Sequence, residues 1–162
     1  MSGSEAESAW NAFVQAEQVY RDALGRLRDF DMRSMLGEAL LRLDWRRQAL
    51  TVIGISDWHV AEALLPELLP LSCVSHSLLG EVRRCILRIP RDALLPAMDE
   101  HVTSLITNPE SDYEAYRRTA ELLRLLKAGS LMGELVEAAD QSPDPDIREV
   151  AEDFRGEVQG TA

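Results

Sequence analysis

The sequence is poor in several residues and patterns on which common functions depend. Lys127 is the only lysine among 162 residues, beside sixteen arginines, a bias typical of a GC-rich bacterial genome. The two cysteines, Cys73 and Cys85, lie in apolar stretches, so we expect buried, reduced thiols and a cytoplasmic protein. No apolar run reaches the roughly 20 residues of a membrane-spanning helix. The acidic residues 1–7 contain no apolar core, so we expect no signal peptide.

The common catalytic patterns are also missing. There is no Gly-x-Ser-x-Gly turn and no glycine-rich phosphate loop. Cys73-x-x-His76, with Cys85 and His101 further on, offers zinc-ligand types, but a zinc site normally has two close ligand pairs and this chain has one. A Cys73–His76 nucleophilic pair is the other possibility, and nothing in the sequence indicates a lowered thiol pKa. We therefore predict structural cysteines, with no metal, no cofactor and no catalytic residue, and an enzyme is the less favoured class.

Negative charge is unevenly spread along the chain. The net charge of −11 disfavours nucleic acid and anionic membranes as partners. Residues 131–162 carry nine acidic residues against two arginines, a net −7 of that −11. Three interpretations stay open for this region: a solvated face, a surface that docks a basic protein, or paired carboxylates for acid–base chemistry, which would need one of them in an apolar pocket.

A helical pattern near the C-terminus recurs upstream. After Pro143, Asp144 and Asp146 suit a helix N-terminus, and apolar residues follow at the spacing of one helix face. The pattern is centred on an arginine, which we take as its origin. Apolar residues lie one place before this arginine, three places after it and six places after it. Four segments of the chain share the pattern, and their origin arginines are 37, 34 and 31 residues apart. Such a period is typical of helical repeat proteins. The four segments are Trp45-Arg46-Ala49-Val52, Val82-Arg83-Ile86-Ile89, Tyr116-Arg117-Ala120-Leu123 and Ile147-Arg148-Ala151-Phe154.

These segments resemble the HEAT-repeat family, whose second helix carries an Asp, then Val-Arg, then a small and an apolar residue. Asp146-Ile147-Arg148 with Ala151 matches best, and the proline-bearing stretches 64–69 and 94–98 are similar to the family's first helix. The resemblance implies a short all-α solenoid of about four helix pairs over residues 32–158, within a single domain of residues 1–162. The long helix expected over residues 4–30 departs from the repeat and is predicted to cap the stack. The resemblance also implies structural roles for the four origin arginines.

The helix boundaries follow from caps and prolines. We expect helices over 57–73, which Pro66 and Pro70 should bend, over 75–89 with Ser75 as cap, and over 91–107, 110–127, 130–141 and 145–158. Residues 32–54 hold either one helix or two with a junction at Asp44-Trp45. The predicted core includes Trp45, Val82, Ile86, Leu123, Ile147 and Phe154.

Function is predicted as non-catalytic recognition of another protein, with a basic surface, through a concave face and the acidic C-terminal unit. An alternative is a small bacterial inhibitor or immunity-type protein that masks a basic partner. A less favoured alternative is a nucleic-acid-acting enzyme, since alkylpurine DNA glycosylases are HEAT-like, as are bilin lyases, but no catalytic residue of either group can be matched here. The sequence sets no oligomeric state. The predicted partner-binding residues are Arg47, Arg84, Arg88, Arg118, Glu149, Glu152 and Asp153.

Overall fold

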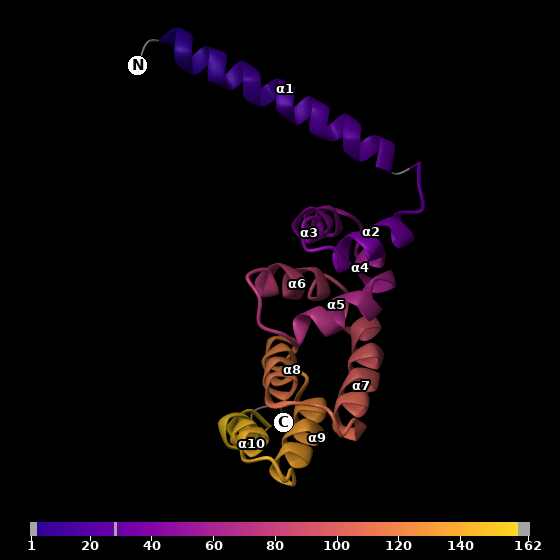
Figure 1. The fold of residues 1–162 in the computed structure, drawn as a ribbon, viewed down its shortest axis with the longest axis vertical. Helices are drawn as coiled ribbons and strands as arrows, with labels where there is room; N and C mark the ends of the chain where they lie inside the picture. Colours follow the sequence, from indigo (N-terminus) through magenta and orange to yellow (C-terminus); the bar gives the residue numbers. More distant parts are fainter. Residues whose placement is uncertain (1–2, 28, 159–162) are drawn as a thin grey trace. The chain divides into compact units, whose positions relative to one another are not determined.

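The protein is all-α over the residues that its structure, a computed structural model, describes. These are residues 3–27 and 29–158, which form ten helices and contain no strand (Figure 1). The chain divides into two compact units, residues 1–35 and 36–162, and each is described by itself. Within the described residues, no helix is both long enough and apolar enough to cross a membrane.

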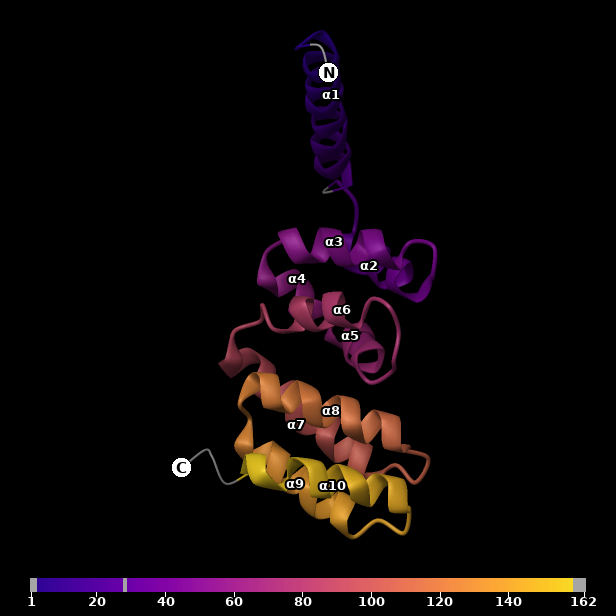
Figure 2. The ribbon, with the colours of Figure 1, turned by 90° about the vertical axis from the view of Figure 1, so that its left-hand side faces the viewer.

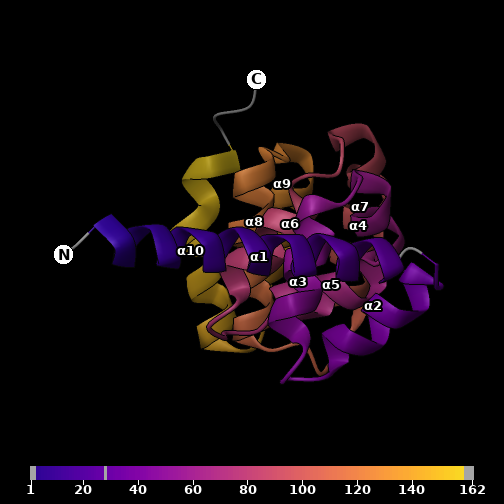
Figure 3. The same cartoon turned by 90° about the horizontal axis from the view of Figure 1, so that it is seen from above.

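The first unit is dominated by α1, Gly3–Leu27, which is drawn in Figure 3 as one uninterrupted helix. Trp10 and Phe13, one turn apart, stack with ring centroids 5.5 Å apart. An ion pair of 2.6 Å joins Arg21 to Glu17, four residues earlier. Such pairs stabilise an exposed helix by a few tenths of a kcal/mol. The helix agrees with the one expected over 4–30, although it ends earlier; its role as a cap stays a prediction.

Residues 32–54 form two helices rather than one. They are α2, Met32–Leu41, and α3, Arg46–Ile55, with the junction where Asp44-Trp45 suggested it. Trp45 was predicted in the core and this is wrong: its side chain is 48% exposed. Because Trp45 is the N-cap of α3, it lies outside the helix, and its ring packs under the guanidinium of Arg42 at 3.4 Å.

The stretch 57–73 breaks instead of bending. It forms α4, Trp58–Ala63, and α5, Leu65–Ser72, separated at Leu64. Pro66 explains the break, because proline has no amide to donate and its ring clashes with the carbonyl of the preceding turn. Asp57 caps α4 by accepting a 3.0 Å hydrogen bond from the amide of His59.

The next helix, α6, spans Leu79–Ile86 and starts four residues later than expected. Ser75 is not its cap, so that prediction is wrong. The Ser75 amide donates instead to Glu114 at 2.7 Å, a residue of another helix. A long-range contact therefore decides the conformation of this loop.

The last four helices match the expected ranges closely. They are α7, Arg91–Thr107, α8, Tyr113–Leu126, α9, Gly129–Asp140, and α10, Pro145–Val158. Asp112 caps α8 by accepting a 2.9 Å bond from the amide of Ala115. Asp144 accepts a 2.9 Å bond from the amide of Asp146 at the start of α10. Pro145 is tolerated there because the first turn of a helix leaves its amides unused.

Within residues 36–158, helices distant in sequence share one core. α10 packs against α9 and α8, α6 packs against α3 and α5, and α5 also contacts α8. Figure 2 shows α3, α6, α8 and α10 following one another in chain order. We call the twelve apolar positions of the four arginine-centred segments the template positions. Ten of them are buried, Trp45 being exposed and Val52 half-buried. Large side chains with almost no exposure include Leu40, Ile53, Leu68, Val82, Ile86, Leu94, Met98, Leu123 and Leu135.

Candidate partner-binding surfaces

Two of the predicted arginines meet at one carboxylate between α3 and α6. Glu81 lies 3.9 Å from a guanidinium nitrogen of Arg47 and 3.6 Å from one of Arg84. Both arginine side chains remain largely exposed. Arg88, one turn beyond Arg84, donates a 2.6 Å bond to the carbonyl of Ser56, where α3 ends. A cation suits this position because carbonyls at a helix C-terminus carry partial negative charge.

Arg84, Arg88 and Glu81 border a groove of about 360 Å³, which we call the α3–α6 groove. Its apolar lining includes Leu50 and the exposed Ile55 from α3 and Cys85 from α6. The Cys85 thiol donates to the Leu50 carbonyl at 3.5 Å, and burial raises the pKa of Cys85 to about 11. The thiol is therefore protonated at neutral pH and acts as an apolar group. The groove can accept an apolar side chain with a neighbouring anionic group.

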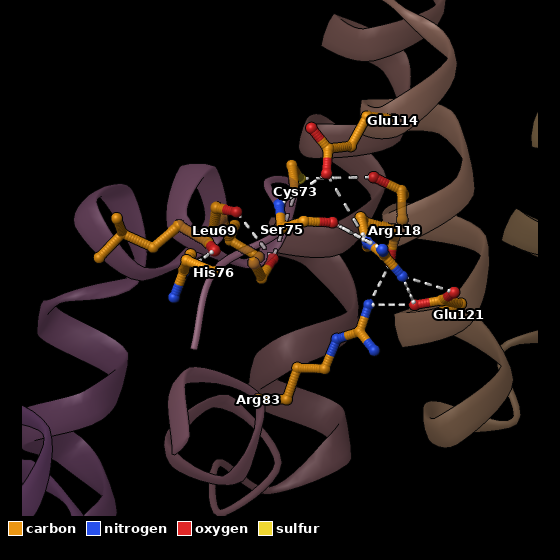
Figure 4. A network of polar contacts seen from close by, with 11 residues as sticks. Leu69, Cys73, Ser75, His76, Arg83, Glu114, Arg118 and Glu121 are labelled. Carbon is orange, nitrogen blue, oxygen red and sulfur yellow. Dashed lines mark hydrogen bonds and ion pairs between the residues drawn. The ribbon is translucent and has the colours of Figure 1, made fainter. Parts of the chain in front are cut away.

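Arg118 does not belong to this surface. Its guanidinium donates to the Ser75 hydroxyl at 2.6 and 3.1 Å and to both carboxylate oxygens of Glu121 at 2.9 Å (Figure 4). Arg118 was predicted to bind a partner, but these bonds hold it half-buried against the loop before α6. Its donors are already used within the fold.

The same network contains Glu121 and Arg83, the origin arginine of the second of the four sequence segments. Arg83 donates to Glu121 at 2.7 Å and to the carbonyl of Arg118 at 3.1 Å, which ties α6 to α8. Both members of the pair are poorly exposed, 14% for Arg83 and 18% for Glu121. Burial alone would raise the pKa of Glu121, but the hydrogen bonds from Arg83 and Arg118 outweigh burial and lower it.

The other origin arginines also bond to groups near helix ends or to acids. Arg46 donates to the carbonyl of Leu40 at 2.7 Å, near the end of α2. Arg117 donates to Asp153 of α10 at 2.8 Å. Arg148 donates to the carbonyl of Ser142 at 2.7 Å, after the end of α9. These arginines connect neighbouring segments and are not spare donors for a ligand.

The predicted acidic residues lie on α10 but differ in their partners. Asp153 is paired with Arg117 from α8, as described above. Glu149 and Glu152 are exposed, and neither makes an ion pair with another residue in the part of the chain that the structure describes. Asp146, Glu149 and Asp153 share one helix face, since they are three and four residues apart. We call Asp146, Glu149, Glu152 and Asp153 the α10 carboxylates.

The structure pairs Cys73 with His101 rather than with His76. The Cys73 sulfur lies 3.3 Å from Nε2 of His101, and the Thr119 hydroxyl lies 3.5 Å from the sulfur. His76 instead holds its own loop, since its ring nitrogens bond the Leu71 carbonyl and the Leu78 amide. Local spacing suggested His76, but α7 supplies the closer imidazole across 28 positions, which no sequence signal indicated.

The Cys73–His101 pair adjoins a cavity of about 400 Å³, yet its electrostatics oppose nucleophilic chemistry. Burial raises the pKa of Cys73 and lowers the pKa of His101. Both shifts favour a neutral thiol beside a neutral imidazole, whereas an activated pair needs a thiolate. In addition, no group of three or more His, Cys, Asp or Glu side chains could hold a metal ion within residues 3–27 and 29–158.

Comparisons of the chain with protein-family models, with curated proteins and with solved structures return no match. Over the described residues, the fold and the sites define an all-α protein with a groove bordered by arginines and a C-terminal helix rich in carboxylates.

Proposed function

We propose that residues 32–158 form a short HEAT-like α-solenoid of about four helix pairs, and that it acts as a non-catalytic protein-binding module. Three observations support the solenoid. The template positions are mostly buried, the four origin arginines bond to acids or to carbonyls near helix ends, and consecutive template-bearing helices pack on one another or on shared neighbours. Stacked repeats bury a continuous core in this way.

The observation that carries the binding proposal is that two of the α10 carboxylates, Glu149 and Glu152, have no cationic partner among the described residues. Glu149 and Glu152 are exposed with no ion pair to another described residue, whereas Arg118 and Arg83 have carboxylate partners inside the fold. An exposed set of like charges raises the local potential and attracts a surface of opposite sign. The partner we propose is a protein with a basic surface, which docks on α10.

The α3–α6 groove extends this proposal to a second contact. On the concave side of the proposed solenoid, Arg84 and Arg88 would bind an acidic group of the partner while Leu50 and Ile55 contact a neighbouring apolar side chain. Arg47 adds a third cation at the rim through its contact with Glu81. Hydrogen bonds between charged groups and partners are stronger than neutral ones, so a few such contacts suffice for specificity.

The test begins with capture of partners from the native host, followed by binding kinetics for whatever protein is captured. Glu149→Lys with Glu152→Lys should slow association, and the wild-type on-rate should fall as salt rises. Asp99→Lys with Glu100→Lys is the matched control, because it makes the same charge change at exposed positions of α7. Equal effects of the two pairs would show that net charge alone matters and would overturn docking on α10.

The inhibitor alternative is separated by the partner's own activity. If the captured protein is an enzyme whose activity disappears on binding, the protein is an inhibitor that uses the same carboxylates. The negative net charge opposes contacts with DNA phosphates. If the preparation nevertheless binds DNA more tightly than any captured protein, the protein-binding proposal is wrong.

A further inference from the structure

The sequence of α1 contains a heptad repeat that runs through all 25 residues of the longest helix described. A row of mostly apolar or small residues runs along the whole helix, with successive members alternately three and four residues apart. This is the spacing of the seam between two helices of a coiled coil. Trp10, 64% exposed, and Phe13, 58% exposed, lie in the middle of this seam. The seam consists of Gly3, Ala6, Trp10, Phe13, Glu17, Tyr20, Leu24 and Leu27.

The positions that flank the seam are equally regular. On one side, Ala9, Ala16 and Ala23 recur every seven residues. On the other side, Glu7, Val14 and Arg21 recur every seven residues, so one acid and one base lie at equal distances from Val14. Small residues allow two helices to approach closely, and charges beside the seam set the orientation of the partner helix.

We propose that α1 pairs with α1 of a second copy of this chain, antiparallel, about a two-fold axis near residue 15. This register places Trp10 opposite Tyr20 of the second copy. It also places Ala6 opposite Leu24 and Phe13 opposite Glu17. Each large residue at the ends of the seam then meets a small one, and the two aromatic rings meet each other, a contact that stabilises beyond the burial of apolar area.

The same register satisfies the flanking positions. Because equivalent flanks face each other in an antiparallel pair, Glu7 meets Arg21 of the second copy, and Val14 meets its own equivalent. On the opposite flank, Ala16 meets its equivalent and Ala9 meets Ala23. Self-complementarity of this kind is what a two-fold interface requires.

Charge decides against a parallel pair. In a parallel register, Glu17 of one copy would face Glu17 of the other inside the seam, and the acidic residues Glu5 and Glu7 of both copies would gather at one end. In the antiparallel register, the two Glu17 side chains lie apart, and each keeps its 2.6 Å ion pair with Arg21. Arg21 can then contact both Glu17 of its own helix and Glu7 of the second copy.

The length of α1 is sufficient for such a pair. Its 25 residues span about 37 Å at 1.5 Å per residue, and three to four heptads are the usual minimum of a coiled coil. Most of the stability of a helix in a protein comes from packing of its apolar face. Pairing would therefore stabilise the helix as well as cover its apolar seam.

Disulfide trapping in the full-length chain tests the register. Ala16→Cys should form an inter-copy disulfide on mild oxidation, because residue 16 faces its equivalent across the axis. Ala9→Cys and Ala23→Cys should each remain monomeric on non-reducing gels, but a mixture of the two should cross-link. The wild type is the control, since Cys73 and Cys85 are buried. Efficient cross-linking by Ala9→Cys alone, or none by Ala16→Cys, would overturn the proposal.

Sedimentation equilibrium tests whether the pair exists without a cross-link. The wild type should be a concentration-dependent dimer, and Phe13→Asp should be a monomer, whereas Gln18→Ala on the outer face should dimerise like the wild type. Glu7→Arg should weaken the dimer by about tenfold through two lost ion pairs, and mixing it with Arg21→Glu should restore association. A wild type that stays monomeric at every concentration, for example because α1 packs on its own chain, would overturn the proposal.

Discussion

The helices α1 and α10 carry similar patterns and have different surroundings. Both are amphipathic, and each has a phenylalanine on its apolar face. Phe154 of α10 is 5% exposed beneath α8 and α9, whereas Phe13 of α1 is 58% exposed. The comparison teaches that the spacing of apolar residues predicts which face of a helix is apolar. It does not predict which other segment packs against that face.

The largest expected effect comes from removing the ring that is buried. Phe154→Ala should lower the free energy of unfolding by about 3–5 kcal/mol, because it leaves a cavity between α8, α9 and α10. Phe13→Ala should leave the unfolding of residues 36–158 unchanged. Denaturant titration followed by circular dichroism measures both, and equal losses would mean that the two helices do not differ as described.

The next largest loss of stability should come from the ion pairs made by α6. The pair of Arg83 with Glu121 is poorly exposed, whereas the contacts of Glu81 with Arg47 and Arg84 involve exposed arginines. Glu121→Ala leaves the poorly exposed Arg83 without its carboxylate partner and should cost about 1–3 kcal/mol. Glu81→Ala removes only the longer contacts to Arg47 and Arg84, and should cost at most about 1 kcal/mol. A larger loss at Glu81 would reverse this ranking of the two sites.

The sheltered pair should also appear in the pH dependence of stability. Because the pKa of Glu121 is lower in the folded chain than in the unfolded one, its contribution is fully present above the unfolded value of about 4.3. The contribution is lost as pH falls through the folded pKa. The stability difference between the wild type and Glu121→Gln should therefore shrink in acid, which denaturant titrations at several pH values would measure. A difference that is constant with pH would contradict this linkage.

The smallest expected effect is on the thiols. Chelator should not change the melting temperature, because Cys73 and Cys85 already have hydrogen-bond partners in the fold. Both thiols should also alkylate slowly at neutral pH until the chain unfolds, since burial raises both pKa values. A loss of several degrees with chelator would instead indicate metal ligation at Cys73.

Several features of the fold could be predicted from the sequence because they depend on neighbours in the chain. The ranges of α7, α9 and α10 follow from apolar spacing and local caps, and Asp57 caps α4 through the amide two residues on. The buried template positions follow from the same spacing. In each case the interacting groups lie within one or two helical turns.

Other features depended on contacts between distant segments. Ser75 bonds Glu114 and Arg118 instead of capping a helix, and Cys73 meets His101 instead of His76. The residues next to Ser75 and Cys73 in the sequence do not indicate which distant residue each one contacts.

The sequence by itself determined an all-α chain, the positions of most helices and the excess of acid near the C-terminus, because propensity, capping and charge are local properties. Only the tertiary structure decided which charges remain exposed. Arg118 and Glu149 are one place beyond the repeat arginines Arg117 and Arg148, yet Arg118 is bound to Ser75 and Glu121 while Glu149 is exposed. The physical reason is that a side chain loses its availability to a partner only when another segment brings a complementary group within hydrogen-bond distance.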